Sequence, residues 1–178
     1  MAWLRQRIAQ EPAGRRRAML ENYLEHLQAE VSGDLERIMA TMTAEPVYRS
    51  FTPSSDGEGP RGQAETRAQY RYLFDNRLNL LERTFDRVMV SDDHIFSDGR
   101  IHQIFPGEVL AARGLDVDRD AWYLYSYRIA AVLPYEGDGT DVRMAGEDTY
   151  TPGMPTLDRV VRLEPEEVPE TLLAPTDR

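Results

Sequence analysis

The chain has 178 residues, of which 41% are hydrophobic, and a formal net charge of −10. This length suits one domain with a sizeable core, and no segment approaches the roughly 18 consecutive apolar residues that a membrane span needs. The acidic charge argues against a nucleic-acid partner, because general phosphate-backbone binders are basic. The absence of cysteine excludes disulfides, thiolate catalysis and cysteine-ligated metals. We therefore expect a cytoplasmic protein with no membrane and no nucleic-acid partner.

The chain opens with a lead-in segment at residues 1–14, and a helix is predicted from about Ala13 to Val31. Its apolar stripe is formed by Leu20, Leu24, Leu27 and Val31. Tyr23 flanks that stripe, and His26 lies roughly 120° from its centre at about 100° per residue. The spacing therefore predicts that His26 is exposed.

Two shorter helices and one strand follow. Ser32-Gly33-Asp34 breaks the first helix and caps a second one that begins at Leu35. Residues 45–53 alternate as a strand, and residues 54–62 form a loop rich in glycine, proline and serine. A third helix is predicted over about residues 63–77, with an inner face formed by Tyr70, Leu73 and Phe74.

The second half of the chain is mostly strand. The predicted strands are residues 84–91, 94–105, 121–135 and 142–150, and residues 106–114 form either a helical turn or a continued edge. Three helices would then gather on one face of a curved antiparallel sheet, which is α+β architecture. We expect one domain over residues 1–155, followed by an acidic, proline-rich tail at 156–178 that is extended or mobile.

Sequence motifs for cofactors and metals are absent. No dinucleotide fingerprint follows a strand, "GEGPRG" lacks the lysine of a phosphate-binding loop, and no H-E-x-x-H pair occurs. The start of a calcium loop at 116–121 has Ala121 where the turn glycine belongs. We therefore expect neither a cofactor nor a bound metal.

Four segments resemble the SnoaL-like proteins of the nuclear-transport-factor-2-like superfamily, which have a cystatin-like cone fold. They are "SGDLERIMATMTAEPVYRSF", "GPRGQAETRAQYRYLF", "DRVMVSDDHIFSDG" and "MAGEDTYTPG". The resemblance covers roughly residues 15–155. It implies a cone-shaped domain with a central, mostly apolar pocket, and sheets that often pair face to face in a homodimer. Members include polyketide cyclases, dehydratases, ketosteroid isomerases and non-catalytic binding proteins, so the fold alone does not give the reaction.

His94 and His102 are candidate acid–base residues, and the position of the turn decides whether they share a face of the sheet. A hairpin at Asp98-Gly99 would place them on opposite faces. A turn at Asp92-Asp93, as the resemblance implies, would leave one strand in which an even step places both on one face. A bulge at Asp98-Gly99 would separate them again. In each geometry, a single histidine in the pocket would suffice as a general base.

The remaining candidates are tyrosines, one carboxylate and their neighbours. The Tyr, Tyr, His, His set of the scytalone dehydratases has loose counterparts in Tyr48, Tyr72, His94 and His102, which makes the two tyrosines candidate hydroxyl donors. Glu147 is a candidate acid, because an inward carboxylate has a raised pKa in an apolar cavity, and Arg128 is its candidate partner. The tyrosines at 123, 125 and 127 share a strand face and line either a cavity or a dimer surface. The candidate ligand-binding residues are Tyr23, Phe51, Tyr70, Phe74, Tyr123, Tyr125, Tyr127 and Arg128.

Two functions follow from this pattern. The first is a cofactor-independent lyase or isomerase, of the dehydratase, cyclase or keto–enol type, that acts on a hydrophobic small molecule. The second is a non-catalytic protein that binds a small ligand or acts as a dimeric partner. A cavity that contains a histidine bonded to a carboxylate would favour the enzyme, and a purely apolar cavity would favour the binder.

Overall fold

Five helices and seven strands build the part of the chain that the computed structural model describes, residues 1–169. The helices are α1 (Ala2–Gln10), α2 (Arg15–Ser32), α3 (Leu35–Ala40), α4 (Gly62–Asp75) and α5 (Gly107–Ala112). The strands are β1 (Met42–Thr52), β2 (Ser55–Glu58), β3 (Leu81–Val90), β4 (His94–Pro106), β5 (Trp122–Asp138), β6 (Asp141–Tyr150) and β7 (Val160–Arg162). No helix within these residues is long and apolar enough to cross a membrane.

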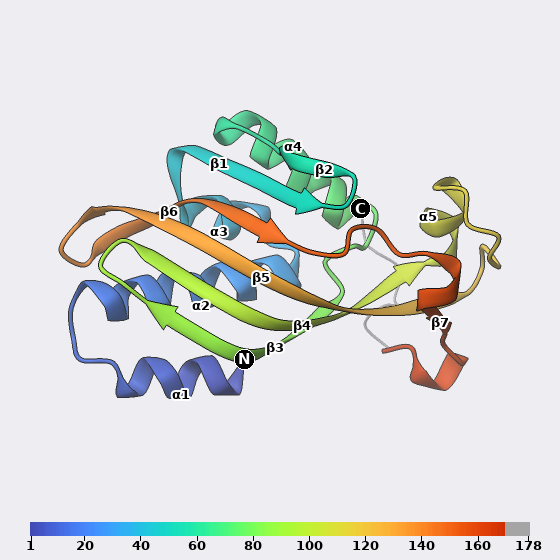
Figure 1. Cartoon of the computed structure of the whole chain (residues 1–178), viewed down its shortest axis with the longest axis horizontal. Helices are drawn as coiled ribbons and strands as arrows, with labels where there is room; N and C mark the ends of the chain where they lie inside the picture. The colour runs from blue at the N-terminus through green and yellow to red at the C-terminus, as the bar shows by residue number, and fades with distance from the viewer. Residues whose placement is uncertain (170–178) are drawn as a thin grey trace.

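One curved sheet carries the fold. Its strand order is β2-β1-β6-β5-β4-β3, and β7 pairs with β5. Neighbouring strands are antiparallel except β1 and β6, which run parallel because the chain passes through the whole sheet before it returns beside β1. Figure 1 shows β4, β5 and β6 crossing the molecule, with the helices α1 and α2 towards one end and α5 and β7 at the other. The α+β class with helices on a curved sheet is therefore confirmed, with one parallel strand pair in it.

The main core lies between the helices and the inner face of the sheet. It joins α1, α2, α3 and α4 to the inward residues of β1, β4, β5 and β6. A second cluster packs α5 against the other end of the sheet through Phe105, Leu110 and Tyr125. The lead-in segment is part of this packing, because α1 buries Leu4 and Ile8.

The inner face of α2 differs from the predicted stripe. Its buried residues are Met19, Leu20, Tyr23, His26, Leu27 and Ala29. The centre of the buried face therefore lies on Tyr23 and Leu27, and Val31 is 39% exposed. The prediction that His26 is exposed is wrong, since its exposed fraction is 2%. The helix ends where Gly33 adopts a left-handed conformation, with φ of 71°.

The ends of the chain adopt more local structure than the composition indicates. Residues 160–162 of the predicted tail form β7, which extends the sheet beside Tyr123 and Tyr125. Short 3₁₀ turns precede and follow that strand, at Leu157–Arg159 and Pro165–Glu167. The part of the tail prediction that concerns residues 170–178 lies outside the described residues.

Candidate functional site

An internal cavity of about 330 Å³ lies between α2, α4 and the inner face of the sheet. Its apolar wall is formed by Leu27, Leu73, Leu78, Leu81, Ile101, Phe105 and Ile129. Two carboxyl groups, Glu30 and Glu147, and two guanidinium groups, Arg83 and Arg113, also line it, together with uncharged polar side chains such as Gln69. Ionisable groups therefore meet apolar side chains in this hollow, which is a common form of a small-molecule site.

Glu30 reaches the cavity from the last full turn of α2. It follows Tyr23 by seven residues and His26 by four, so all three side chains share the buried side of the helix. Burial and, to a smaller extent, the charge of Glu147 raise the pKa of Glu30 to about 7, although the charge of Arg83 lowers it. Glu30 therefore exchanges a proton in the neutral range, where an ordinary glutamate is already ionised.

Glu147 and Arg83 face each other across the cavity. Glu147 lies on the inner face of β6, and burial raises its pKa while the Arg83 charge lowers it. The Arg83 Nη1 atom is 3.9 Å from Oε1 of Glu147, and the side chains are 7% and 14% exposed. The distance gives an ion pair without a direct hydrogen bond. Arg83 thus provides one positive charge for two nearby carboxyl groups.

The Arg83 guanidinium is held in place but is not fully paired. Its Nη2 donates to Ser97 Oγ at 2.9 Å, and the group lies over the rings of Tyr23 and Phe85 at 5.9 and 5.2 Å from their centroids. Its Nε–H is buried and has no hydrogen-bond partner among residues 1–169. A buried N–H without a partner is costly, so Arg83 has hydrogen-bonding capacity that the protein itself does not use.

A smaller cavity of about 170 Å³ adjoins the first and shares Glu30 and Glu147 with it. Tyr48 and Tyr70 line it, and their hydroxyl oxygens are 3.2 Å apart. Burial raises the pKa of both phenols well above the usual value. Two predicted residues, Tyr48 and Tyr70, therefore lie together with Glu147.

A chain of hydrogen bonds behind these tyrosines fixes the state of His26. The Thr41 hydroxyl donates to the carbonyl of Ile38 at 2.6 Å, so it accepts from Nδ1–H of His26, 2.8 Å away. Nε2 of His26 then accepts from the Tyr70 hydroxyl at 3.1 Å. Burial lowers the His26 pKa to about 3. The buried histidine is therefore neutral, and it is bonded to hydroxyl groups and not to a carboxylate.

His94 and His102 lie outside the cavity. The turn after β3 lies at residues 91–93, and β4 pairs with β5 without interruption from His94 to Pro106. The two histidines therefore share a face, as in the second of the three predicted geometries, but it is the outer face, and they are about 26 Å apart along the strand. His94 contacts Asp93 Oδ1 at 2.9 Å. His102 bonds Ser126 Oγ at 2.8 Å beside an open apolar groove.

The Asp98-Gly99 pair has a packing role and forms no turn. A Cβ atom on Gly99 would overlap the carbonyl oxygen of Thr84 on β3. The bulge of this strand pair lies on β3, between Phe85 and Arg87. Gly99 is needed because the backbones of β3 and β4 approach closely there. In the sequence alone, the same Asp-Gly pair resembles a hairpin turn.

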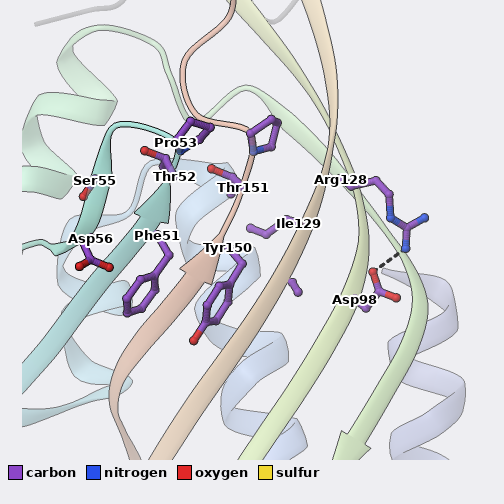
Figure 2. A pocket seen from close by; sticks show the side chains of 12 residues that line it. Phe51, Thr52, Pro53, Ser55, Asp56, Asp98, Arg128, Ile129, Tyr150 and Thr151 are labelled. Carbon is purple, nitrogen blue, oxygen red and sulfur yellow. Dashed lines mark hydrogen bonds and ion pairs between the residues drawn. The ribbon is translucent and has the colours of Figure 1, made fainter.

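Phe51 and Arg128 lie on a second, more open hollow of about 580 Å³ at the outer face. Figure 2 shows the rings of Phe51 and Tyr150 side by side and Arg128 directed towards Asp98. The ring centroids are 4.8 Å apart, and Arg128 pairs with Asp98 and with Asp86 at 2.5 and 2.9 Å. The predicted pairing of Arg128 with Glu147 is therefore wrong, because Arg128 points away from the cavity and Arg83 takes that position.

The remaining predicted tyrosines and Phe74 divide between cavity, core and surface. Tyr127 lines the cavity and donates to Gln103 Oε1 at 3.2 Å. Tyr123 and Tyr125 share its strand face but are buried in the second core cluster. Tyr23 is buried, and its hydroxyl lies 3.2 Å from Ser97 Oγ. Phe74 packs against the main core. Tyr72 is 49% exposed.

Sequence reasoning missed Glu30 and Arg83. Each had a signal, namely a charged residue on a face that is otherwise apolar. Glu30 continues the Tyr23 and Leu27 side of α2, and Arg83 lies between Leu81 and Phe85 on the inner face of β3. To use these signals, the buried face of each element must be known. The predicted apolar stripe of α2 was centred on the wrong side of the helix, and the predicted strand began at residue 84, after Arg83. Among residues 1–169, no group of three or more histidine, aspartate or glutamate side chains is arranged to hold a metal ion.

Comparison with known proteins relates this architecture to solved structures. No protein-family model and no curated protein matches the sequence. A protein assigned as a SnoaL-like polyketide cyclase from Shewanella denitrificans OS-217 is similar with a TM-score of 0.60 at 11% identity, over 75% of this chain and 89% of that one. A ketosteroid isomerase-like protein from Erwinia carotovora atroseptica gives 0.56 at 15% identity, over 78% and 97%. An NTF2-like protein from Anabaena variabilis gives 0.54 at 13% identity, over 78% and 89%.

The architecture and these similarities agree. In this chain, helices pack on one curved, unclosed sheet, and the three solved structures have a similar fold over about three quarters of its length. The chain therefore has the fold of the nuclear-transport-factor-2-like superfamily, as the sequence predicted.

Proposed function

We propose that the cavity is the active site of a lyase or isomerase that moves a proton on a hydrophobic carbonyl compound, with side chains as its only acid and base. The observation that carries this proposal is the meeting of Glu30, Glu147 and Arg83 in one cavity that also has an apolar wall. Solved structures of this fold include proteins assigned as polyketide cyclases and ketosteroid isomerase-like proteins, which supports the reaction class by analogy only.

The proposed reaction begins at Glu30. Its carboxylate takes a proton from the carbon next to the substrate carbonyl. The electrons of that C–H bond form a carbon–carbon double bond, and the carbonyl π electrons move to oxygen as an enolate. Arg83 stabilises the negative oxygen through its N–H groups, one of which is unpaired in the structure. A base with a pKa of about 7 suits this step, because it is both ionised and basic enough near neutral pH.

The second step returns the proton. Glu30, now protonated, gives it to another carbon of the enolate in an isomerisation, or to a departing hydroxyl group in a dehydration. Glu147 keeps the Arg83 charge close to the reacting oxygen, since their atoms are 3.9 Å apart. Because Arg83 is shared between the two carboxyl groups, it stabilises the Glu30 anion less than it would stabilise a single partner, and the pKa of Glu30 stays high. In this proposal Glu30 transfers the proton and Glu147 positions Arg83.

Deuterium exchange tests the proposal without knowledge of the natural substrate. A panel of hydrophobic ketones is incubated with the protein in D₂O, and loss of the α-proton signal is followed by NMR. Wild type is expected to exchange at least one ketone, and Glu30→Gln is expected to slow this by about 10²–10⁴-fold, the usual contribution of a general base. Glu82→Gln, on the outward side of the same strand as Arg83, is the matched control and keeps the wild-type rate.

The alternative function, a non-catalytic ligand-binding protein, is favoured by the apolar part of the cavity wall, which Leu27, Leu73 and Ile129 help to form. Native mass spectrometry of the same ketone mixtures separates the two. Binding of a ketone by wild type without any exchange above the Glu30→Gln level would contradict the catalytic proposal and support the binder.

A further inference from the structure

Three exposed side chains from separate segments meet at the mouth of the cavity. Arg113 follows α5, Tyr72 lies on α4, and Met154 lies in the segment after β6. Nη2 of Arg113 donates to the Tyr72 hydroxyl at 3.1 Å, and Nη1 lies 2.9 Å from the Met154 sulfur. Arg113 and Met154 line the same cavity as Glu30 and Glu147. The mouth therefore presents a guanidinium to any molecule that enters.

The charge of Arg113 is not compensated locally. A phenol is neutral and a thioether is a weak acceptor, and within residues 1–169 no carboxylate forms an ion pair with Arg113. By contrast, Arg128 and Arg162 are paired with aspartates. A guanidinium has five N–H donors, of which these contacts use two. The remaining donors are available to an anion.

The strand geometry separates Arg113 from the proposed reaction centre. Arg83 pairs with Ile101 on β4, and the cavity wall continues along that strand to Phe105. That segment spans about 13 Å. The chain then enters α5, which Arg113 caps, at the end of the molecule far from α1 (Figure 1). A molecule that reaches both arginines must therefore be elongated, with an apolar middle.

The geometry points to a substrate with a carboxylate at the end opposite its reacting carbonyl, held at the mouth by Arg113. This inference rests on the proposed function and adds the substrate class, a hydrophobic keto acid. One guanidinium supplies a single positive charge and a planar pair of donors, which match a carboxylate. In a protein of net charge −10, such a local cation also offsets the general repulsion of an anion.

The test compares two ligands that differ only at one end. One is a phenyl ketone whose acyl chain ends in a carboxylate, and the other is its methyl ester. Isothermal titration is made with wild type, Arg113→Gln and Arg119→Gln, where Arg119 is an exposed arginine of the loop after α5 that does not line the cavity. Wild type and Arg119→Gln are expected to bind the carboxylate about tenfold more tightly than the ester, and Arg113→Gln is expected to bind both equally.

Three results would overturn the inference: no binding of the carboxylate to wild type, equal affinity of wild type for both ligands, or a preference that survives in Arg113→Gln. Deuterium exchange of the same ketone is measured in parallel. A preference that depends on Arg113, without exchange, leaves the anion site standing and contradicts the proposed proton transfer. Exchange without a carboxylate preference supports the proposed proton transfer and contradicts the anion site. The failure of one proposal can therefore be distinguished from the failure of the other.

Discussion

Burial of the Glu30 carboxyl group makes the stability of the folded chain depend on pH. Its pKa is raised from 4.5 to about 7, mainly by burial. Below pH 4.5 the group is protonated in both folded and unfolded chains. As the pH rises towards 7 the unfolded chain ionises first, so the folded state loses stability. Above pH 7 the full cost applies, roughly 2–4 kcal/mol by linkage.

Replacement of Glu30 is therefore expected to stabilise the protein at alkaline pH. Glu30→Gln keeps the size of the side chain and removes the titration, so its free energy of unfolding should exceed that of wild type by roughly 2–4 kcal/mol at pH 8 and match it near pH 4. Urea unfolding at both pH values, with Glu82→Gln as control, measures this difference. Equal stability of Glu30→Gln and wild type at pH 8 would show that Glu30 is not held in a costly state.

The same residue shows why the site was only partly predictable. Glu147 was a candidate because it and its neighbour Asp148 occupy opposite faces of the last long strand, while the irregularity after Met144 that turns Glu147 inwards has no signal in the sequence. Glu30 was missed because the predicted apolar stripe of α2 is rotated around the helix axis, by about one residue, from the face that is actually buried. The same rotation placed His26 on the surface in the prediction. Four apolar residues do not fix the phase of a helix when tyrosine and histidine also face inwards.

At the scale of elements, one polar network connects α2, α3, β1 and α4 inside the core. It runs from Thr41 through His26 and Tyr70 to Tyr48. The link between His26 and Tyr70 depends on a neutral imidazole, because Nε2 accepts the hydrogen bond that the Tyr70 hydroxyl donates. The His26 pKa is lowered from 6.5 to about 3 by burial. As the pH falls below 6.5 the unfolded chain takes up a proton that the folded chain refuses, so stability decreases with acid.

His26→Asn is expected to reveal this dependence. At pH 8 the variant should be less stable than wild type by roughly 1–3 kcal/mol, because it leaves buried hydroxyl groups without a partner. Wild type loses stability as the pH falls and the variant lacks this loss, so the difference should close near about pH 5. Thermal unfolding between pH 8 and 5 provides the measurement, with a substitution of the exposed His94, at the start of β4, by asparagine (His94→Asn) as control. A difference that stays constant with pH would contradict a neutral, buried His26.

Element order was more predictable than element pairing. The long strands from His94 onward were recognised by alternation, and their predicted bounds lie within three residues of those observed. The parallel pairing of β1 with β6 joins residues about 100 positions apart, and no local pattern reports it. The short strand β2 lies in a segment that reads as a loop, since Ser55–Glu58 contains no apolar residue.

At the scale of the whole molecule, the fold was recognisable because it depends on the order of helices and strands. A hollow of about 330 Å³ lies between the helices and the sheet, and polar and apolar side chains both line it. Its charged residues come from α2, β3, β6 and the end of α5, which are far apart in the sequence. Histidines drew attention in the sequence because of their chemistry, but uninterrupted pairing of β4 places both of them on the outer face.

The pH dependence of ketone α-deuteration tests the central claim, that Glu30 is a proton-transfer group tuned by the cavity. The account predicts a rate that rises with pH to a plateau, with a midpoint near the Glu30 pKa of about 7, and loss of this dependence in Glu30→Gln. A midpoint near the ordinary glutamate value, or the same profile in Glu30→Gln and wild type, would contradict it.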